Sequence, residues 1–379
     1  MEFLKNKVKE ITKKQMVFYI FIVLMFIGSL IFVFYNHSFY DQPIAKVIET
    51  KIVDTTETTD ANQNKDQLFT QQITAVLKNG EQKGQMIHLT NEYSSSGAYD
   101  QKYRAGNELF VSIDKNTKAT DPLTGHIKNV KRDQYIVMIA WIFIFTLLIV
   151  GKKQGLFSII SFTINALLLS YGLYVYVHYE NMNLLWICGI IAILFTIISL
   201  LLVSGFTKKT YTAIIATLLG TFSSLLITYL AMWVTSGNGL RYEEMQFLTR
   251  PYRIVFMAGL LIGSLGAVMD IAITMSSFIF ELYEKDHNIS IQALKDSGME
   301  IGRDVMGTIT NILFFVYVSG SIPMLILYLK NEIPLGATLS MNLSLEIARA
   351  LAGGIGVVLT IPISLYTSIF FVNRERAKS

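Results

Sequence analysis

The sequence predicts an all-α membrane protein with about eight transmembrane helices and a small extracytoplasmic β domain after the first helix. Three observations lead to this fold class. Hydrophobic residues make up 52% of the 379 residues and charged residues only 16%, whereas soluble domains carry about 25% charged residues. The apolar residues gather in long runs, and one polar stretch alternates as β-strands do. The single cysteine, Cys188, excludes a disulfide-stabilised scaffold.

Eight apolar runs are candidates for transmembrane helices, because about 20 predominantly apolar residues are needed to cross the hydrocarbon core. The predicted spans are residues 16–35, 135–151, 156–177, 184–205, 211–234, 254–280, 304–329 and 346–372. The last three runs are long, so we expect those helices to be tilted, kinked or extended beyond the lipid.

The distribution of Lys and Arg predicts that both termini face the cytoplasm. Five lysines lie within residues 1–15, before the first run. Asn36–Phe39 is not a small-residue cleavage site, so the first run is expected to be an uncleaved anchor. Positive residues recur in loops that then fall inside, such as those with Lys152 and Lys208. The predicted order is a cytoplasmic tail (1–15), an anchor (16–35), an extracytoplasmic domain (36–133), a seven-helix domain (134–373) and a cytoplasmic tail (374–379).

Residues 36–133 form the only long polar stretch, and they are expected to fold as β structure. Segments such as 44–53 and 108–113 alternate apolar and polar residues and are rich in Thr, Val and Ile. The pattern predicts about five strands in an OB-like barrel or a sandwich, with the polar run Asp54–Lys65 as a loop. Small open barrels bind oligosaccharides or nucleic acids, but no basic aromatic face is visible here, so nucleic acid is not expected. A structural cap or partner-docking module is favoured over ligand binding.

The sixth run contains an acidic residue, Asp270, near the predicted centre of the bilayer. A carboxylate at that depth costs roughly 2.5–3.5 kcal/mol on insertion scales, so ionisable residues within spans generally mark pathways. Small and polar residues share the helical face of Asp270, and they are Gly259, Gly263, Gly266, Thr274 and Ser277. A glycine stripe lets another helix approach closely. A substrate, ion or proton path is favoured, and a buried hydrogen-bond network is the alternative.

The seventh run carries three further polar residues on one face: Asp304, Thr308 and Asn311. Asp304 lies at the predicted start of the helix, where an acid is favoured by the helix dipole. Asn311 lies deeper, where it can bond either another helix or a substrate. Ser319–Pro323 predicts a kink. The preceding segment, 288–302, is weakly amphipathic and is expected to lie along the membrane surface. A plain connector is favoured, and a coupling helix is the alternative.

The eighth run begins with Glu346 and Arg349, which are three residues apart and so can pair on the helix surface. Arg349 is also one candidate counter-charge for Asp270. Gly353 and Gly356 continue the run and are candidates for close helix packing. Because Pro362 follows these glycines, the sequence also predicts a weak helix that breaks, as helices at transporter binding sites often do.

Motifs of common enzyme classes are absent, so the chain is not expected to be an enzyme or to hold a cofactor. The sequence contains no phosphate-binding GxxxxGK[ST] loop, no HExxH and no GxSxG. The histidines lie outside the predicted spans, and they are His37, His88, His126, His178 and His287. Whether a metal binds is left undecided.

The last three runs resemble the YibE/F family of bacterial membrane proteins. The resemblance is carried by Gly266–Ser277, Gly298–Asn311, Glu346–Gly356 and Thr360–Pro362. It extends over roughly residues 130–375, and the anchor with its polar domain resembles the longer, YibE-like member. The resemblance implies a multi-pass protein of the bacterial cell membrane, a role as a transport component, and a second, YibF-like membrane protein as partner.

We therefore expect a permease or efflux component with a polar path around Asp270. Thr274, Asp304, Thr308, Asn311, Glu346 and Arg349 are the other residues expected to line or gate the path. The bilayer, a YibF-like protein and further copies of this chain are the expected partners. The alternative is a membrane scaffold that transports nothing and whose extracytoplasmic domain docks a partner.

Overall fold

The computed structural model describes residues 13–61, 63–97, 100–114, 122–179, 182–245 and 251–377. The first twelve residues of the predicted tail 1–15 and the last two residues of the predicted tail 374–379 lie outside this description. The chain divides into two compact units, Met1–Thr146 and Leu147–Ser379, which are described separately.

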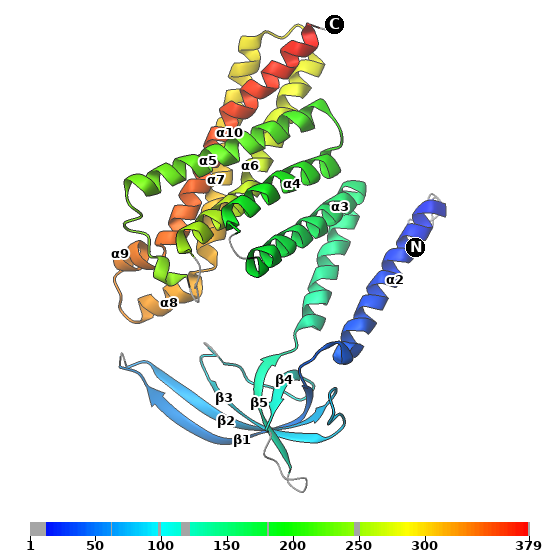
Figure 1. Cartoon of the computed structure of the whole chain (residues 1–379), viewed down its shortest axis with the longest axis vertical. Helices are drawn as coiled ribbons and strands as arrows, with labels where there is room; N and C mark the ends of the chain where they lie inside the picture. The colour runs from blue at the N-terminus through cyan, green and yellow to red at the C-terminus, as the bar shows by residue number, and fades with distance from the viewer. Residues whose placement is uncertain are drawn as a thin grey trace, which may run out of the picture. The chain divides into compact units, whose positions relative to one another are not determined.

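The first unit contains helix α2 (Lys13–Tyr35), a short 3₁₀ turn η1 (Asn36–Phe39), five strands and the beginning of helix α3 (Asp133–His178) (Figure 1). The strands are β1 (Ile44–Thr59), β2 (Lys65–Leu77), β3 (Met86–Ser94), β4 (Glu108–Ile113) and β5 (Leu123–Val130). Helix α2 packs against the first part of α3, where the Trp141 indole donates a 2.7 Å hydrogen bond to Ser29.

The five strands close into a barrel in the order β1-β2-β3-β5-β4. β3 and β5 pair in parallel, while the other neighbours are antiparallel. Alternate residues of β2 point inward, so that Ile73, Ala75 and Leu77 are buried against Ile87 and Leu109 of the neighbouring strands. The strand order agrees with the predicted OB-like barrel and excludes the predicted sandwich for the described residues.

The prediction of a loop at Asp54–Lys65 is wrong. β1 runs on to Thr59 and β2 starts at Lys65, so most of the predicted loop is strand. The two strands stay paired up to Thr59 opposite Lys65 and form an arm beyond the barrel. Thr is β-branched and favours strands even where both faces are polar, which explains why a polar run is extended.

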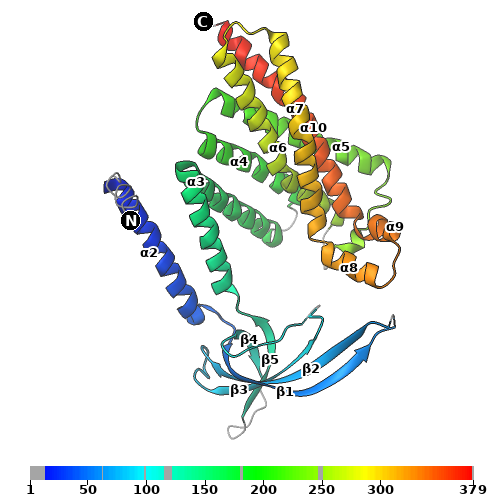
Figure 2. The same cartoon turned by 180° about the vertical axis from the view of Figure 1, so that it is seen from behind.

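Helix α3 contains the two predicted spans 135–151 and 156–177 in a single element, interrupted at Lys152, which has a φ of 47° and a ψ of −121°. The axis turns back sharply there (Figures 1 and 2). Gly155 permits the turn, because a Cβ on it would lie 2.1 Å from the carbonyl oxygen of Leu147. The described residues contain seven helices long and apolar enough to cross a membrane. The sequence predicts eight spans, and the difference arises because two of them lie in the single element α3.

The second unit is a helical bundle with its core around α6 (Tyr252–Lys285) and α10 (Ser344–Arg376). These two helices pack against each other and against α5 (Lys208–Val234), while α4 (Leu184–Ser204) and α7 (Ile291–Ser319) cover α6. Ile271, Met275 and Val357 are almost fully buried there. Small hydroxyl residues let α5 and α10 approach closely, and Ser224 of α5 donates a 2.6 Å hydrogen bond to the carbonyl of Ala352 in α10.

The prediction of a surface connector at 288–302 is wrong, because α7 already starts at Ile291 and its first turns pack against the core. Ser290 caps the helix by accepting a hydrogen bond from the backbone N–H of Ala293. Leu294 is fully buried, and the glycine at 298 leaves room for Ile279 and Leu365. The weak amphipathicity of the sequence therefore reflects packing against α6 and α10.

The kink predicted at Ser319–Pro323 is confirmed as a break between two helices. α7 ends at Ser319, and the short helix α8 (Ile322–Lys330) begins after two intervening residues, with Pro323 in its first turn. The expected span 304–329 is therefore two helices. A short helix α9 (Leu335–Ala337) and the π-helical turn η3 (Thr338–Asn342) lead into α10. The predicted break in α10 is wrong, since the helix continues through its glycines and Pro362.

Candidate functional site

Asp270 lies on the face of α6 that points away from the core. Its neighbours in sequence, Val268 and Ile271, are both fully buried, whereas Asp270 is exposed. Among the described residues, no hydrogen bond or ion pair reaches its carboxylate. The bundle therefore holds an unpaired acid in the middle of an apolar helix and leaves it uncovered.

Antiparallel packing of α6 and α7 places several predicted polar residues at the level of Asp270. A Cβ on Gly263 of α6 would meet the Tyr317 hydroxyl of α7, and a Cβ on Gly298 of α7 would meet Ile279 of α6. In each of these facing pairs the two residue numbers add up to about 580, which gives the partner level for any other residue. Thr308 of α7 is therefore level with Asp270. All of Asp270, Thr274, Asp304 and Thr308 are exposed. These four residues on neighbouring helices are called the polar face below.

Asn311 lies at the edge of a groove between α7 and α10 with a volume of about 480 Å³. The groove is lined mainly by apolar residues of α10, among them Leu351 and Val358. Thr310 and Asn311 are its polar residues, and the Thr310 hydroxyl is buried without a hydrogen-bond partner among the described residues. Asn311 is therefore directed to this groove.

Glu346 and Arg349 pair with each other near the start of α10. The Arg349 guanidinium also lies 5.4 Å from the centre of the Phe256 ring, which is a favourable cation–π position. Phe256 precedes Asp270 by fourteen residues on α6, or roughly 20 Å of helix at about 1.5 Å per residue. The structure therefore does not bring Arg349 to Asp270 as a counter-charge.

The glycines predicted to mediate helix packing behave in two ways. A Cβ on Gly353 would lie 3.1 Å from Leu313, and one on Gly356 would lie 3.1 Å from Val268, so both lie at close helix contacts. A Cβ on Gly263 would lie 2.3 Å from the Tyr317 hydroxyl. Gly259 and Gly266 have no atom of the described residues within 4 Å of such a Cβ, so these residues do not make the packing predicted for them.

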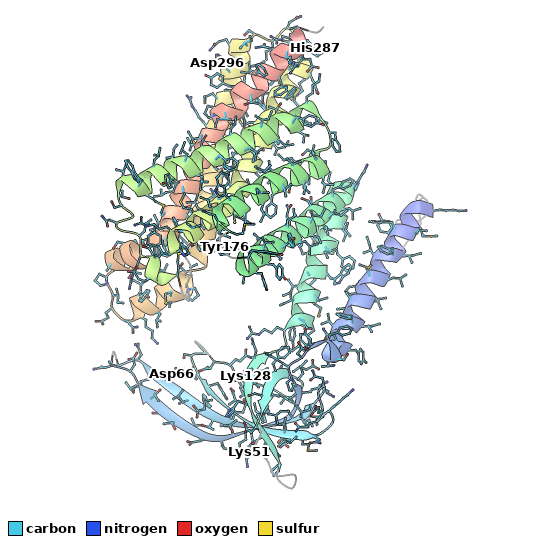
Figure 3. All side chains as sticks on the ribbon, in the orientation of Figure 1. Lys51, Asp66, Lys128, Tyr176, His287 and Asp296 are labelled. Atoms are coloured by element: carbon cyan, nitrogen blue, oxygen red, sulfur yellow. The ribbon has the colours of Figure 1, made fainter. Side chains whose placement is uncertain are left out.

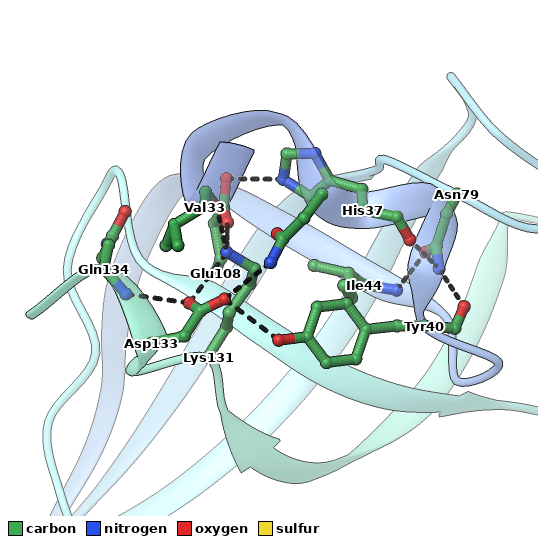
Figure 4. Close-up of polar contacts among 10 residues, drawn as sticks. Val33, His37, Tyr40, Ile44, Asn79, Glu108, Lys131, Asp133 and Gln134 are labelled. Atoms are coloured by element: carbon green, nitrogen blue, oxygen red, sulfur yellow. Dashed lines mark hydrogen bonds and ion pairs between the residues drawn. The ribbon is translucent and has the colours of Figure 1, made fainter. Parts of the chain in front are cut away.

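Sequence reasoning missed a polar cluster at the junction of α2, the barrel and α3 (Figure 4). Lys131 is 1% exposed, and its ammonium group donates to the carbonyl of Val33 and to Asp133. Glu108 lies 3.5 Å from the same ammonium group and 3.0 Å from His37 Nε2. The members are far apart in the sequence, so no local motif could have predicted them.

Asn36 and Tyr40 complete this cluster by donating hydrogen bonds of 3.0 Å to Asp133. Burial, together with the hydrogen bond to Asp133, raises the pKa of Tyr40, so its hydroxyl remains a donor at neutral pH. The described residues contain no group of three or more His, Cys, Asp or Glu side chains that could hold a metal ion.

Two family models match the chain. Residues 139–374 match the YibE/F-like protein model, and residues 38–130 match the model of the YibE/F family N-terminal domain. Searches of the curated proteins and of the solved structures give no match. The first match covers most of the helical unit and the second covers the barrel, so the chain belongs to the YibE/F family and has the N-terminal domain of its longer members.

Proposed function

We propose that this chain is a membrane-embedded subunit of a bacterial permease or efflux complex, and that its polar face lines the transport path. The role is not enzymatic. In this proposal α2 and the helical unit cross the cell membrane, both termini are cytoplasmic and the barrel is outside. The substrate is left open.

The observation that carries the proposal is the uncovered carboxylate of Asp270. An acid facing lipid near the bilayer centre is unfavourable by about 2.5–3.5 kcal/mol. Exposure to water, protonation or a partner from another polypeptide removes this penalty. Because the described residues do not cover the face, a second subunit completes the path in our proposal, either a YibF-like protein or another copy of this chain.

Other polar residues near the level of Asp270 favour a transport path, since an isolated acid would have no such neighbours. Thr308 adds a hydroxyl group at the level of Asp270, Thr274 adds one a turn further along α6, and Asp304 adds a second acid on α7. Hydroxyl and carboxylate oxygens bind hydrated cations and protons, and intramembrane acids serve as proton relays in transporters. Asn311 and the α7–α10 groove offer an adjoining site for an apolar part of a substrate.

The scaffold remains the second candidate, because Gly259 and Gly266 precede Asp270 on α6 and no atom of the described residues lies within 4 Å of a Cβ at either position. Small residues at such spacings allow a helix of another protein to pack closely. In this case the polar face is only an assembly surface and no substrate passes.

Complementation of a deletion strain separates the two candidates. The strain is first screened for growth defects against metal ions, envelope stress and peptide antibiotics. If the polar face lines a transport path, Asp270→Asn is expected not to restore growth, because the charge is lost. The complex is still expected to assemble, because the amide fills the same space as the carboxylate. Asp296→Asn is the matched control, since Asp296 is exposed near the N-terminal end of α7, away from the polar face (Figure 3). Full complementation by Asp270→Asn contradicts the proposal that the polar face lines a transport path.

A further inference from the structure

A pocket of about 830 Å³ lies within the first unit, where α2 ends and the barrel begins. Its walls have opposite character. One wall is the last two turns of α2, with Leu30, Ile31, Phe34 and Tyr35. The other wall belongs to the barrel and carries three lysines, which are Lys46 of β1 and Lys78 and Lys83 of the β2–β3 turn. The pocket is therefore apolar on one side and basic on the other.

Asn79 holds the basic wall in place. Its side-chain amide donates to the backbone carbonyls of His37, Tyr40 and Gln42, while its oxygen accepts a 2.6 Å hydrogen bond from the backbone N–H of Ile44 (Figure 4). Asn79 is buried. These bonds connect the β2–β3 turn to the segment that follows α2, so both walls are positioned before any ligand binds.

The pocket has an excess of positive charge. Its single acidic lining residue, Glu108, is already engaged by Lys131 and His37. None of Lys46, Lys78 and Lys83 makes an ion pair with a carboxylate among the residues that the structure describes. Three ammonium groups around one concave surface favour a multivalent anion such as a phosphate group.

We infer that this pocket binds the phosphate group of an anionic phospholipid, with the three lysines around the phosphate and an acyl chain along α2. The inference rests on the membrane insertion of α2 that is part of the proposed function. α2 is one of the candidate spans, and the pocket lies where this apolar helix ends and the polar domain starts. Tyr35, which is 77% exposed at that boundary, is typical of the headgroup layer.

The apolar wall distinguishes a lipid from a free phosphate compound. Inorganic phosphate or glycerol phosphate satisfies the lysines but leaves Ile31 and Phe34 facing water, and both are exposed in the chain alone. A phospholipid fills both walls at once. Basic residues next to a span also attract anionic lipids without any pocket, so the test must separate a built site from diffuse attraction.

The test measures lipid binding to the full chain in detergent micelles by native mass spectrometry. Phosphatidylglycerol and phosphatidylcholine of equal chain length are titrated in parallel. Three lysines in contact with one phosphate are expected to give a preference for phosphatidylglycerol on the order of 100-fold. Replacing Lys46, Lys78 and Lys83 together by Gln is expected to remove most of this preference, and replacing them by Arg is expected to retain it.

The matched control removes three lysines of the same domain that do not line the pocket: Lys51→Gln, Lys65→Gln and Lys128→Gln. Lys51 and Lys128 are labelled in Figure 3. The control variant is expected to keep the preference. An unchanged preference in the pocket variant, or an equal loss in the control, overturns the inference. If the triple pocket variant does not fold, the three single variants decide, and an unchanged preference in all of them overturns it.

Glycerol phosphate is titrated separately to identify the source of the phosphate. It is expected to bind much more weakly than phosphatidylglycerol, and equal affinity overturns the assignment to a lipid. This experiment does not depend on transport. If Asp270→Asn complements fully while the lipid preference follows the pocket lysines, only the proposed function fails.

Discussion

The ammonium group of Lys131 donates a 2.8 Å hydrogen bond to the backbone carbonyl of Val33, which lies 98 residues earlier in the chain. Val33 belongs to the last turn of α2, and Lys131 immediately precedes α3. The bond therefore joins the end of one candidate membrane helix to the start of the next, beside the barrel. Because Lys131 is almost completely buried, this connection is protected from competing water.

Replacing Lys131 is expected to destabilise the chain strongly. Lys131→Met keeps the length of the side chain but leaves Glu108 and Asp133 without their cation, and breaking a buried ion pair costs about 3–5 kcal/mol. Denaturant titration of the chain in detergent micelles measures the loss. Lys128→Met, at an exposed position of the same domain, is expected to change the free energy of unfolding by less than about 0.5 kcal/mol. Equal effects of the two substitutions contradict the role of the cluster.

Asn79→Ala is expected to weaken both the fold and the lipid preference. The substitution leaves the buried backbone N–H of Ile44 unpaired, which costs about 1–3 kcal/mol, and it frees the turn that carries Lys78 and Lys83. Thermal unfolding and the phosphatidylglycerol titration measure the two effects. Asn129→Ala is the control, because Asn129 is exposed and bonds only the next backbone N–H. A destabilised Asn79→Ala chain with full lipid preference contradicts the positioning role.

The tip of the β1–β2 arm, where Asp66 lies, is expected to loosen at low pH. Hydrogen bonds from Ser95 and Ser96 hold the pKa of Asp66 well below its usual range. Because the folded pKa is depressed, this contribution is present above the unfolded value of about 4. It is lost as the pH falls through the folded pKa. The protection of the Ser96 amide, which bonds Asp66, is measured as its hydrogen-exchange rate relative to an unstructured peptide at the same pH. This protection is expected to fall in that acidic window and, at neutral pH, in Asp66→Ala.

The control for this prediction is Asp54→Ala on the same arm, because Asp54 bonds only the backbone N–H of the following residue. It is expected to leave the exchange of the Ser96 amide unchanged. Protection that is independent of pH and of Asp66 shows that the serine contacts do not hold the arm.

The two kinds of glycine are expected to respond differently to a larger side chain. Gly356→Leu places atoms against Val268 and Ser224, and overpacking typically costs about 1–3 kcal/mol. Gly266→Leu meets open space in the isolated chain, so its melting temperature is expected to stay the same. In membranes, however, Gly266→Leu is expected to reduce cross-linking to the partner subunit. Unchanged cross-linking contradicts an assembly role for this face.

The barrel and the positions of most helices could be predicted, because alternation in strands and long apolar runs are local features of the sequence. The arm at Asp54–Lys65 was mistaken for a loop because a two-stranded arm with both faces in water has no apolar alternation. The connector at 288–302 was mistaken because glycine at 298 and 302 removes the apolar bulk by which a core helix is recognised, although close packing requires it.

The candidate site was only partly predictable, for a different physical reason. Periodicity identified Asp270, Thr274 and the glycines as one face, but it could not show that Asp270 and Thr274 are exposed while Gly263 packs against Tyr317. In a membrane, lipid-facing and protein-facing surfaces are both apolar, so hydrophobicity does not orient a helix. The lipid pocket escaped prediction since its residues come from α2, η1, two strands and a turn, which only the folded barrel brings together.

The most direct test of the central claim is the water accessibility of position 270 in native membranes. Cys188, the single cysteine, is replaced by Ala, and Asp270→Cys or Phe315→Cys is introduced. Phe315 is 67% exposed on α7 and serves as the lipid-facing control. The path predicts that a charged thiol reagent modifies position 270 on the order of 100-fold faster than position 315, as follows from the cost of bringing a charge into lipid. Equal and slow modification of both positions contradicts a polar path at Asp270.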